Sequence, residues 1–265
     1  MVLNHRARGR GTTLPAPFLR RVALKAPLAG LRADYPFSLP WLRDDAWELE
    51  LTTPVTILMG ENGVGKSTLI EALAALAGYD EAGGGKGYMP VDHSRAIDRS
   101  GVALADHFRA GWLPKVTDGW FFRAESFYSV ARYLDEAARS GGGPPPDFLS
   151  HSHGEGFLRF FEERCQRQGI FFLDEPESAL SPARQLDLLA ILQRIQETAT
   201  AQVIMATHSP ILMALPGATL FQITRAGLDV VDVTDTRHFR LYGAFLRDPV
   251  GFIRDAIEER SQPKD

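Results

Sequence analysis

The sequence predicts an α/β fold with a mostly parallel central sheet, and two observations support this prediction. First, short continuous apolar stretches alternate with stretches of helical periodicity, which is typical of a sheet that helices cover on both faces. Second, three apolar stretches end in polar clusters, and ligands bind at the carboxyl ends of the strands in open α/β sheets. These stretches are VTILMG (55–60), GIFFLDEP (169–176) and AQVIMATHSP (201–210).

Length and composition fit one large domain. The chain has 265 residues, a formal net charge of -4 and a single cysteine, Cys165. A net negative charge gives no general attraction to nucleic acid or anionic membranes, and a lone cysteine cannot form an internal disulfide. No apolar run approaches the roughly 20 residues that a membrane-spanning helix needs. We therefore expect a cytoplasmic protein.

We divide the chain into a flexible basic arm (residues 1–13) and a single domain (residues 14–265). The arm, MVLNHRARGRGTT, lacks the apolar segment of a secretory signal. Its arginines leave a weak nucleic-acid contact open, although no basic stripe marks a DNA groove elsewhere. Residues 79–168 contain fewer apolar strands, and we expect a mainly helical insertion there.

Local patterns place the elements around these strands. A helix should follow Gly65, because Leu69, Leu73 and Leu76 fall on one helical face. The stretch GWFFRAESFYSV (119–130) is typical of a strand that leaves into a turn.

Farther along the chain, we expect a helix from Gly156 to Gln168 and another that starts at Pro182 with Ser181 as its N-cap. A hairpin should turn at Ala226–Gly227. The residues from His238 to Glu259 are expected to be helical, with a break near Asp248–Pro249.

The stretch GENGVGKST fits the phosphate-binding P-loop pattern G-x-x-x-x-G-K-[ST]. Glycines keep side chains away, so that backbone N–H groups and the start of the next helix can meet a phosphate. Lys66 can place its ammonium between the β- and γ-phosphates, and Ser67 can offer its hydroxyl to Mg²⁺. The expected phosphate-binding residues are Gly60, Glu61, Asn62, Gly63, Val64, Gly65, Lys66, Ser67 and Thr68.

A second acidic element should complete the magnesium site. Asp174 ends the apolar strand of GIFFLDEP, and Glu175 follows it at once. An aspartate that coordinates Mg²⁺ beside a glutamate that polarises water is a hydrolytic arrangement. We therefore expect Ser67 and Asp174 as the metal ligands and Glu175 as the catalytic base.

In their order and spacing, five motifs resemble those of the ABC-type ATPases, in particular the soluble SMC- and RecF-like branch and the small stand-alone ATPases called AAA family. The resemblance covers about Tyr35 to Pro210. It implies a P-loop NTPase fold with antiparallel N-terminal strands, and ATP hydrolysis with Mg²⁺ in which Lys66 and His208 act on the γ-phosphate. The motifs are the P-loop, a candidate signature SHGEG (152–156), the Walker B strand FFLDEPE (171–177), a D-loop SALS (178–181) and the switch histidine of THSP (207–210).

The resemblance also implies a homodimer in which two copies sandwich two ATP molecules head to tail. Ser152 and Gly154 of one copy would then contact the γ-phosphate bound to the other. His153 and Glu155 depart from the usual Ser-Gly-Gly-Gln form of this signature, so a polar loop ahead of a core helix is the alternative.

Two further nucleotide contacts are expected by resemblance. Glu125 takes the position of the family's Q-loop glutamine, and its alternative is a surface acid paired with Arg123. The adenine ring usually stacks on an aromatic or cationic side chain of the N-terminal segment, where Tyr35, Trp41 and Arg32 are candidates. The HSH of residues 151–153 has too few companions for a zinc site.

We therefore expect an ATPase that drives an unidentified conformational task at a dimer interface, with a further protein partner left open. An ATP-gated dimerisation switch with little turnover uses the same residues and remains an alternative. An ATPase subunit of a membrane transporter is a third, against which the missing Q-loop glutamine counts. A small-molecule kinase is least favoured, because DEPESALS and THSP match the hydrolytic pattern.

Overall fold

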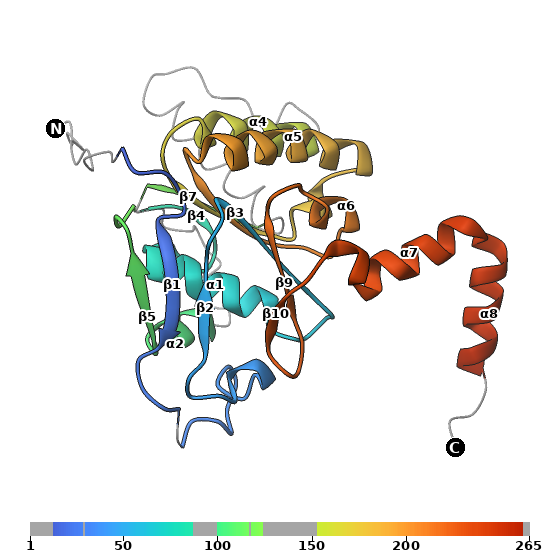
Figure 1. The fold of residues 1–265 in the computed structure, drawn as a ribbon, viewed down its shortest axis with the longest axis horizontal. Coiled ribbons are helices and arrows are strands. Elements are labelled where there is room, and N and C mark those ends of the chain that lie inside the picture. The colour runs from blue at the N-terminus through green and yellow to red at the C-terminus, as the bar shows by residue number, and fades with distance from the viewer. Residues whose placement is uncertain (1–12, 29, 87–99, 117, 124–152, 262–265) are drawn as a thin grey trace.

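The computed structural model describes residues 13–28, 30–86, 100–116, 118–123 and 153–261. A large sheet of seven strands has the order β10-β9-β3-β8-β7-β6-β4, and Figure 1 shows it among the helices of the molecule. Its strands are β3 (Val55–Gly60), β4 (Gly84–Gly85), β6 (Gly119–Arg123), β7 (Ile170–Asp174), β8 (Gln202–Ala206), β9 (Thr219–Ile223) and β10 (Leu228–Val230).

The central five strands of this sheet are parallel, as predicted, and only β4 and β10 at the two edges are antiparallel to their neighbours. The strands β3, β7 and β8 are buried along their whole length, which explains why their sequences lack polar alternation. The register aligns Arg123 with Asp174 and Asp174 with Ala206. The carboxyl ends of β6, β7 and β8 therefore lie level at one edge.

A smaller antiparallel sheet has the order β2-β1-β5, with β1 (Leu19–Leu24), β2 (Glu48–Glu50) and β5 (Phe108–Trp112). It confirms the prediction of antiparallel N-terminal strands. The third strand, β5, comes from the 79–168 segment, which the sequence did not predict to pair with the N-terminal region.

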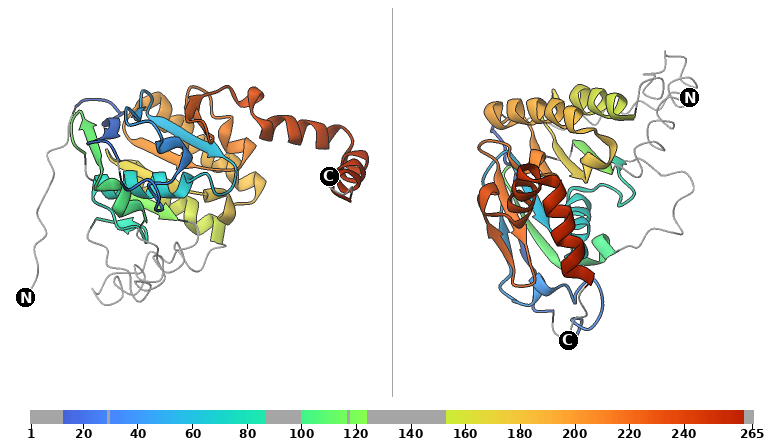
Figure 2. Two further views of the ribbon diagram at one scale, coloured as in Figure 1. Left: turned by 90° about the horizontal axis from the view of Figure 1, so that it is seen from below. Right: turned by 90° about the vertical axis from the view of Figure 1, so that its right-hand side faces the viewer.

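Helices cover both faces of the large sheet (Figures 1 and 2). Helices α1 (Lys66–Ala77) and α2 (Ser100–Ala105) share one hydrophobic core with the small sheet. Helices α4 (His153–Cys165), α5 (Pro182–Thr198) and α6 (Pro210–Met213) contribute to the other core. Ser181 caps α5 by accepting a hydrogen bond from the Arg184 N–H, as expected.

The described part of the 79–168 segment contains α2 and α4 together with β4, β5 and β6. Because residues 87–99 and 124–152 lie outside the described ranges, the mainly helical character of this insertion stays a prediction. The predicted arm at 1–13 likewise lies outside them, except for its last residue.

Beyond the β9–β10 hairpin, two helices form a C-terminal arm that projects from the body of the molecule (Figure 1). They are α7 (Arg237–Arg247) and α8 (Pro249–Ser261), and the break between them falls at Asp248, where the sequence predicted it. Within the described residues, no helix has the length and apolar character needed to cross a membrane. The remaining short helices are η1 (Pro40–Leu42), η2 (Pro176–Ala179) and η3 (Val233–Asp235).

Candidate nucleotide-binding site

The P-loop turns between β3 and α1 with two glycines in the left-handed region, Gly63 (φ 76°) and Gly65 (φ 93°). Gly65 is also the N-cap of α1, so the unpaired N–H groups of the first helical turn face the loop. A Cβ atom on Gly60 would lie 2.6 Å from the carbonyl oxygen of Ile223. The glycines of this motif are therefore required by conformation and by close packing.

Side chains of the N-terminal segment before β2 contact the P-loop and the start of α1. The Trp41 Nε1–H donates to the Val64 carbonyl at 2.8 Å, and the Tyr35 hydroxyl contacts the Thr68 hydroxyl. The Arg32 guanidinium is bonded to Asp45 and to the backbone of η1. Each of the three candidates for adenine stacking thus has a structural contact of its own, and Trp41 is buried.

Lys66 is buried at the start of α1, with only 4% of its surface exposed. Its ammonium donates to the Glu61 carbonyl at 3.2 Å, so it folds back over the loop. Burial lowers the pKa of Lys66, while the nearby carboxylates of Glu175 and Asp174 oppose that shift. No carboxylate among the described residues lies within ion-pair distance of this ammonium, and an anion in the loop would offset the cost of burying it.

Two hard oxygen ligands meet where the sequence predicts magnesium. The Ser67 hydroxyl donates to Asp174 Oδ1 at 3.2 Å, although the two residues are separated by 107 positions in the chain. Hydroxyl and carboxylate oxygens are the ligands that Mg²⁺ takes in phosphate-binding sites, where water and phosphate complete the octahedron. The residues present therefore fit the metal that the motif implies.

Arg123, at the end of β6, is a site residue that the sequence analysis missed. Its guanidinium lies 2.7 Å from Glu71 Oε1 and 3.8 Å from Asp174 Oδ2. It also donates to the Glu81 carbonyl at 3.0 Å. Arg123 thus approaches one oxygen of Asp174 while Ser67 contacts the other, which orients this carboxylate.

Glu175 follows β7 in a left-handed backbone conformation (φ 49°, ψ 54°). Its N–H donates to the Ala206 carbonyl at 2.9 Å, which ties this unusual residue to the end of β8. Its side chain is partly exposed, and Oε1 lies 3.6 Å from His208 Nε2. The structure thus brings the predicted base and the predicted switch histidine together.

His208 points an unsatisfied nitrogen into the site. Its Nε2 is buried and has no hydrogen-bond partner among the described residues. Burial lowers the pKa of His208, and the positive charge of Lys66 lowers it further, which favours a neutral imidazole at neutral pH. A buried nitrogen without a partner suits a ligand group.

Glu177, in the last position of FFLDEPE, fixes the histidine loop. Its carboxylate accepts a hydrogen bond from the His208 N–H at 2.6 Å and one from the Thr207 hydroxyl at 2.8 Å. Burial raises the pKa of Glu177, and these two bonds oppose the shift. Sequence reasoning gave this acid no role, because its partners are about 30 residues away in the chain.

A pocket of about 200 Å³ adjoins the P-loop on its outer side. Arg43 and Arg225 line it, and neither forms an ion pair with a carboxylate in the part of the chain that the structure describes. Its position beside the phosphate loop suits the nucleoside end of a nucleotide. The lining residues are Pro40, Arg43, Asn62, Gly63, Val64, Thr224 and Arg225.

The candidate signature is described only from His153 onward, so Ser152 lies outside the described residues. The candidate Q-loop residue Glu125 also lies outside them. Gly154 lies in the first turn of α4, and a Cβ there would be 3.0 Å from the Ala179 carbonyl. This glycine therefore lets the start of α4 pack closely against the D-loop.

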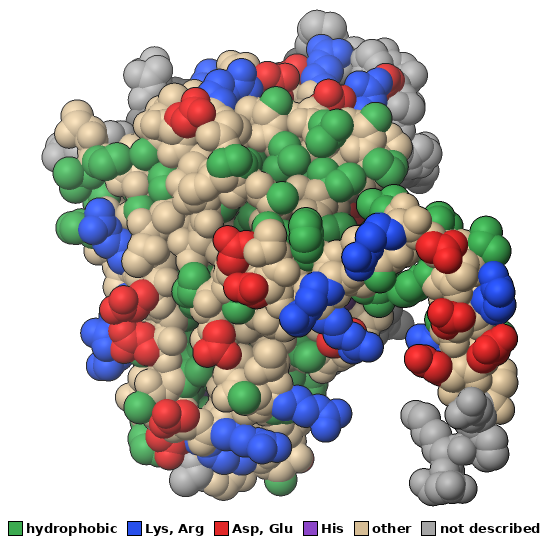
Figure 3. All heavy atoms as spheres, turned by 45° about the vertical axis from the view of Figure 1, so that its right-hand side comes forward, with side chains coloured by type: hydrophobic (Ala, Val, Ile, Leu, Met, Phe, Trp, Pro, Cys, Tyr) green, Lys and Arg blue, Asp and Glu red, His purple; other side chains and the backbone are tan. Residues whose placement is uncertain are grey.

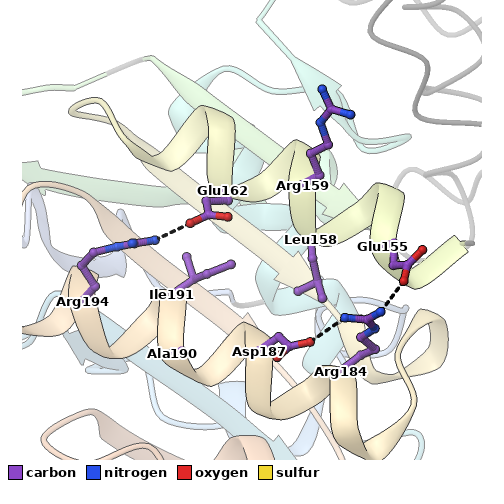
Figure 4. Close-up of a pocket in the computed structure, with 9 residues that line it drawn as sticks. All are labelled: Glu155, Leu158, Arg159, Glu162, Arg184, Asp187, Ala190, Ile191 and Arg194. Carbon is purple, nitrogen blue, oxygen red and sulfur yellow. Dashed lines mark hydrogen bonds and ion pairs between the residues drawn. The ribbon is translucent and has the colours of Figure 1, made fainter. Parts of the chain in front are cut away.

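A second cavity, of about 360 Å³, lies between α4 and α5 (Figure 4). Arg184 contacts both Glu155 and Asp187, and Arg194 lies 2.9 Å from Glu162. Arg159, which also lines the cavity, is paired with Glu163, so all three arginines of this described lining already have carboxylate partners and are not free to bind a phosphate ligand. It is lined by Glu155, Leu158, Arg159, Glu162, Arg184, Asp187, Ala190, Ile191 and Arg194.

Two family models match separate stretches of the chain. A model described as "AAA domain" matches residues 38–103. A second, described as "AAA domain, putative AbiEii toxin, Type IV TA system", matches residues 151–214. The first match contains the P-loop, and the second contains Glu175 and His208. No curated protein matches the sequence.

Several solved structures resemble this fold at low sequence identity. CbiO1 from Clostridium perfringens, part of the ABC transporter complex CbiONQ, is 16% identical, with a TM-score of 0.44 over 91% of this chain and 100% of that chain. The SMC head domain from Thermotoga maritima is 15% identical, with a TM-score of 0.41 over 81% and 98%. An ATP-binding cassette of an ABC transporter is 13% identical, with a TM-score of 0.46 over 86% and 99%.

The P-loop between β3 and α1 lies within the first family match, and the acids Asp174 and Glu175 that follow the core of β7 lie within the second. Together with the mostly parallel sheet and its P-loop, the two matches support a P-loop domain of the AAA type.

Proposed function

We propose that the protein binds Mg-ATP at this site and hydrolyses it between two copies of the chain. One observation carries the proposal: the edge of the sheet unites the buried Lys66, the Ser67–Asp174 pair and the Glu175–His208 pair. These groups come from three separated stretches of sequence, and each is of the type that phosphoryl transfer to water requires.

Each group has a distinct task in this proposal. Lys66 and the loop N–H groups hold the phosphates, and bound Mg²⁺ neutralises charge on them. Glu175 is half-exposed beside the site, where it orients a water molecule and accepts its proton. His208 offers Nε2 to the γ-phosphate. Arg123 and Glu177 are positioning residues, because they act through Asp174 and the His208 backbone.

The pocket beside the P-loop is proposed to receive the nucleoside. The guanidinium groups of Arg43 and Arg225 can stack on a purine ring or bond to ribose oxygens. This assignment replaces the aromatic candidates of the N-terminal segment, whose side chains hold the loop instead.

We further propose that the second half of each site comes from a partner copy. Ser152 and Gly154 of the partner copy would approach the γ-phosphate bound to the first copy. Within each copy, Glu125 would take the place of the family's Q-loop glutamine. A partner copy can approach here because Asn62 in the P-loop is exposed. Ser178 and Ser181 of the D-loop, just before α5, are exposed as well.

Glu175→Gln provides the direct test. This change removes the base but keeps the shape, so we expect phosphate release to fall roughly 10²–10⁴-fold with ATP affinity nearly unchanged. Steady-state phosphate release and fluorescent nucleotide titration measure the two quantities. The control, Glu50→Gln, alters an exposed acid of β2 and should leave both unchanged.

The alternatives give different results in the same experiment. If the unaltered protein binds ATP and dimerises but releases no phosphate, it is an ATP-gated switch. If Glu175→Gln hydrolyses ATP as fast as the parent, the role given to Glu175 is wrong.

A further inference from the structure

The C-terminal arm, α7 and α8, exposes an apolar surface that the body of its own chain does not cover. Neither helix contains a buried residue. In Figure 3 the arm stands out to one side with apolar, basic and acidic side chains on the visible face. Its large exposed apolar residues are Phe239, Leu241, Tyr242, Leu246, Val250, Ile253 and Ile257.

The arm is a defined element with its own internal contacts. The rings of Phe245 and Phe252 pack edge to face at 6.0 Å and join the two helices. Asp248 caps the start of α8 by accepting a hydrogen bond from the Gly251 N–H at 3.0 Å. These contacts fix the bend and leave the other apolar side chains facing outward.

The outward residues have the spacing of helix–helix contacts. On α7 the exposed residues Phe239, Tyr242 and Leu246 recur at positions i, i+3 and i+7. On α8 the exposed residues Val250, Ile253 and Ile257 recur at the same spacing. Such a stripe packs against another amphipathic helix.

The charges of the two helices select the partner. Helix α7 carries no acid and three arginines, of which Arg237 is paired with Glu61 of its own chain and Arg240 and Arg247 remain for a partner, whereas α8 carries three acids and two arginines. If α7 of one copy lies along α8 of another, a two-fold axis repeats the favourable pairing twice. The acids of α8 disfavour adsorption of the whole arm to an anionic membrane, where both helices should be basic.

The base of the arm lies at the nucleotide site. Arg237 Nη1 is 3.1 Å from Glu61 Oε1 in the P-loop, and the rings of His238 and His208 are 5.9 Å apart. The arm therefore starts at the edge where the proposed ATP-dependent dimer closes. Helices of 11 and 13 residues reach roughly 16 and 20 Å at 1.5 Å per residue, enough to extend onto a neighbouring copy.

We propose that the arms of two copies exchange, so that α7 of each packs on α8 of the other. This contact needs no nucleotide, whereas the proposed ATP sandwich does. The arm would hold two copies together and keep their nucleotide sites close between turnovers.

Analytical ultracentrifugation of the protein without nucleotide tests the exchange. We expect twice the mass of the 29.3 kDa chain for the unaltered protein and for the control Leu113→Asp, which alters an exposed leucine directly after β5 and outside the arm. Leu246→Asp and Ile253→Asp should both give monomers, with circular dichroism unchanged. A monomeric parent protein, or arm variants that remain dimers, would overturn the proposal.

Crosslinking tests the pairing itself. We would mix Tyr242→Cys protein with Ile253→Cys protein and add a short bis-maleimide. The native Cys165 is buried, and burial raises the pKa of its thiol to about 11, so it should not react. Crosslinking in the mixture well above that of either variant alone is expected. Equal crosslinking in the separate variants, or vesicle binding by a monomer, contradicts the exchange.

The result is independent of catalysis. If Leu246→Asp loses the dimer but still binds ATP, the result supports the arm exchange and does not bear on the proposed ATPase site. Failure of ATP binding in the unaltered dimer would contradict the proposed ATPase and leave the arm exchange standing.

Discussion

Glu175 occupies a left-handed backbone conformation that costs a non-glycine residue of order 1–3 kcal/mol. The hydrogen bond from its N–H to Ala206 and the bond that its carbonyl accepts from the Ser178 N–H at 3.0 Å maintain this conformation. The turn after β7 thereby directs the two neighbouring side chains to different partners: Asp174 contacts Ser67, and Glu175 lies near His208.

Glu71 makes a pH-dependent contribution to stability. This residue of α1 lies beside Arg123, yet burial outweighs that ion pair and raises the pKa of Glu71 from 4.5 to about 7. The folded protein therefore binds more protons at this residue than the unfolded chain does between pH 4.5 and 7. Its contribution to the free energy of unfolding should fall as the pH rises through this window and level off above it.

Comparing the parent with Glu71→Gln isolates this effect. We expect the parent to lose more stability than the variant between pH 5 and pH 8 in urea unfolding, because glutamine does not titrate. Parallel pH curves for the two proteins would show that Glu71 is ionised throughout. The matched control is Glu50→Gln, whose pH curve should follow that of the parent, since Glu50 is exposed.

At the scale of elements, the β9–β10 hairpin and the N-terminal segment form the pocket beside the P-loop. Arg225 follows β9, and Arg43 follows η1. β9 pairs directly with β3, which brings the hairpin turn beside the loop. The nucleoside assignment therefore depends on two elements that are far apart in the sequence.

Arg43→Ala with Arg225→Ala tests this pocket. If it receives the nucleoside, ATP affinity should fall roughly 10-fold or more, about 1.4 kcal/mol, with inorganic tripolyphosphate affinity nearly unchanged. Isothermal titration of both ligands measures the difference. Equal losses for both would mean that these arginines act only through charge, and unchanged ATP affinity would remove them from the site. Arg109→Ala, which alters an exposed arginine on β5, is the control.

Sequence patterns predicted several helices and strands near their observed positions, because the residues that determine these elements are close together in the sequence. The strand before the P-loop, the helix after it, the Ser181 cap and the break at Asp248 depend on neighbouring residues. Pairing between distant segments was not predicted. The joining of β5 to β1 depends on burial in a core shared by residues that are more than 80 positions apart.

At the scale of the whole molecule, the proposed dimer makes a prediction about mixtures. Glu175→Gln and Ser152→Ala should each be inactive. In a mixed dimer, one site would contain both changes and the other neither, if Ser152 acts across the interface. With random exchange, half of the dimers are mixed, so mixing should restore about a quarter of the parent's activity.

Phosphate release at constant total protein measures this complementation. Mixing Glu175→Gln with Lys66→Ala is the control, because both residues belong to the same copy's half of the site and a mixed dimer keeps no intact site. No recovery in the Ser152 mixture, with both proteins dimeric, would place Ser152 in the site of its own chain or outside any site.

The sequence by itself predicted the P-loop and the acids Asp174 and Glu175, because each is a short local motif with a recognisable residue pattern, and it predicted His208 through the resemblance of its motif. Only the tertiary structure showed that Arg123 orients Asp174 and that Glu177 holds His208, since these contacts join residues 51 and 31 positions apart. It also decided that Trp41 supports the loop and that α7 and α8 stand away from the body. Local patterns specify what a segment can form, whereas burial and contact between distant segments decide what each side chain faces.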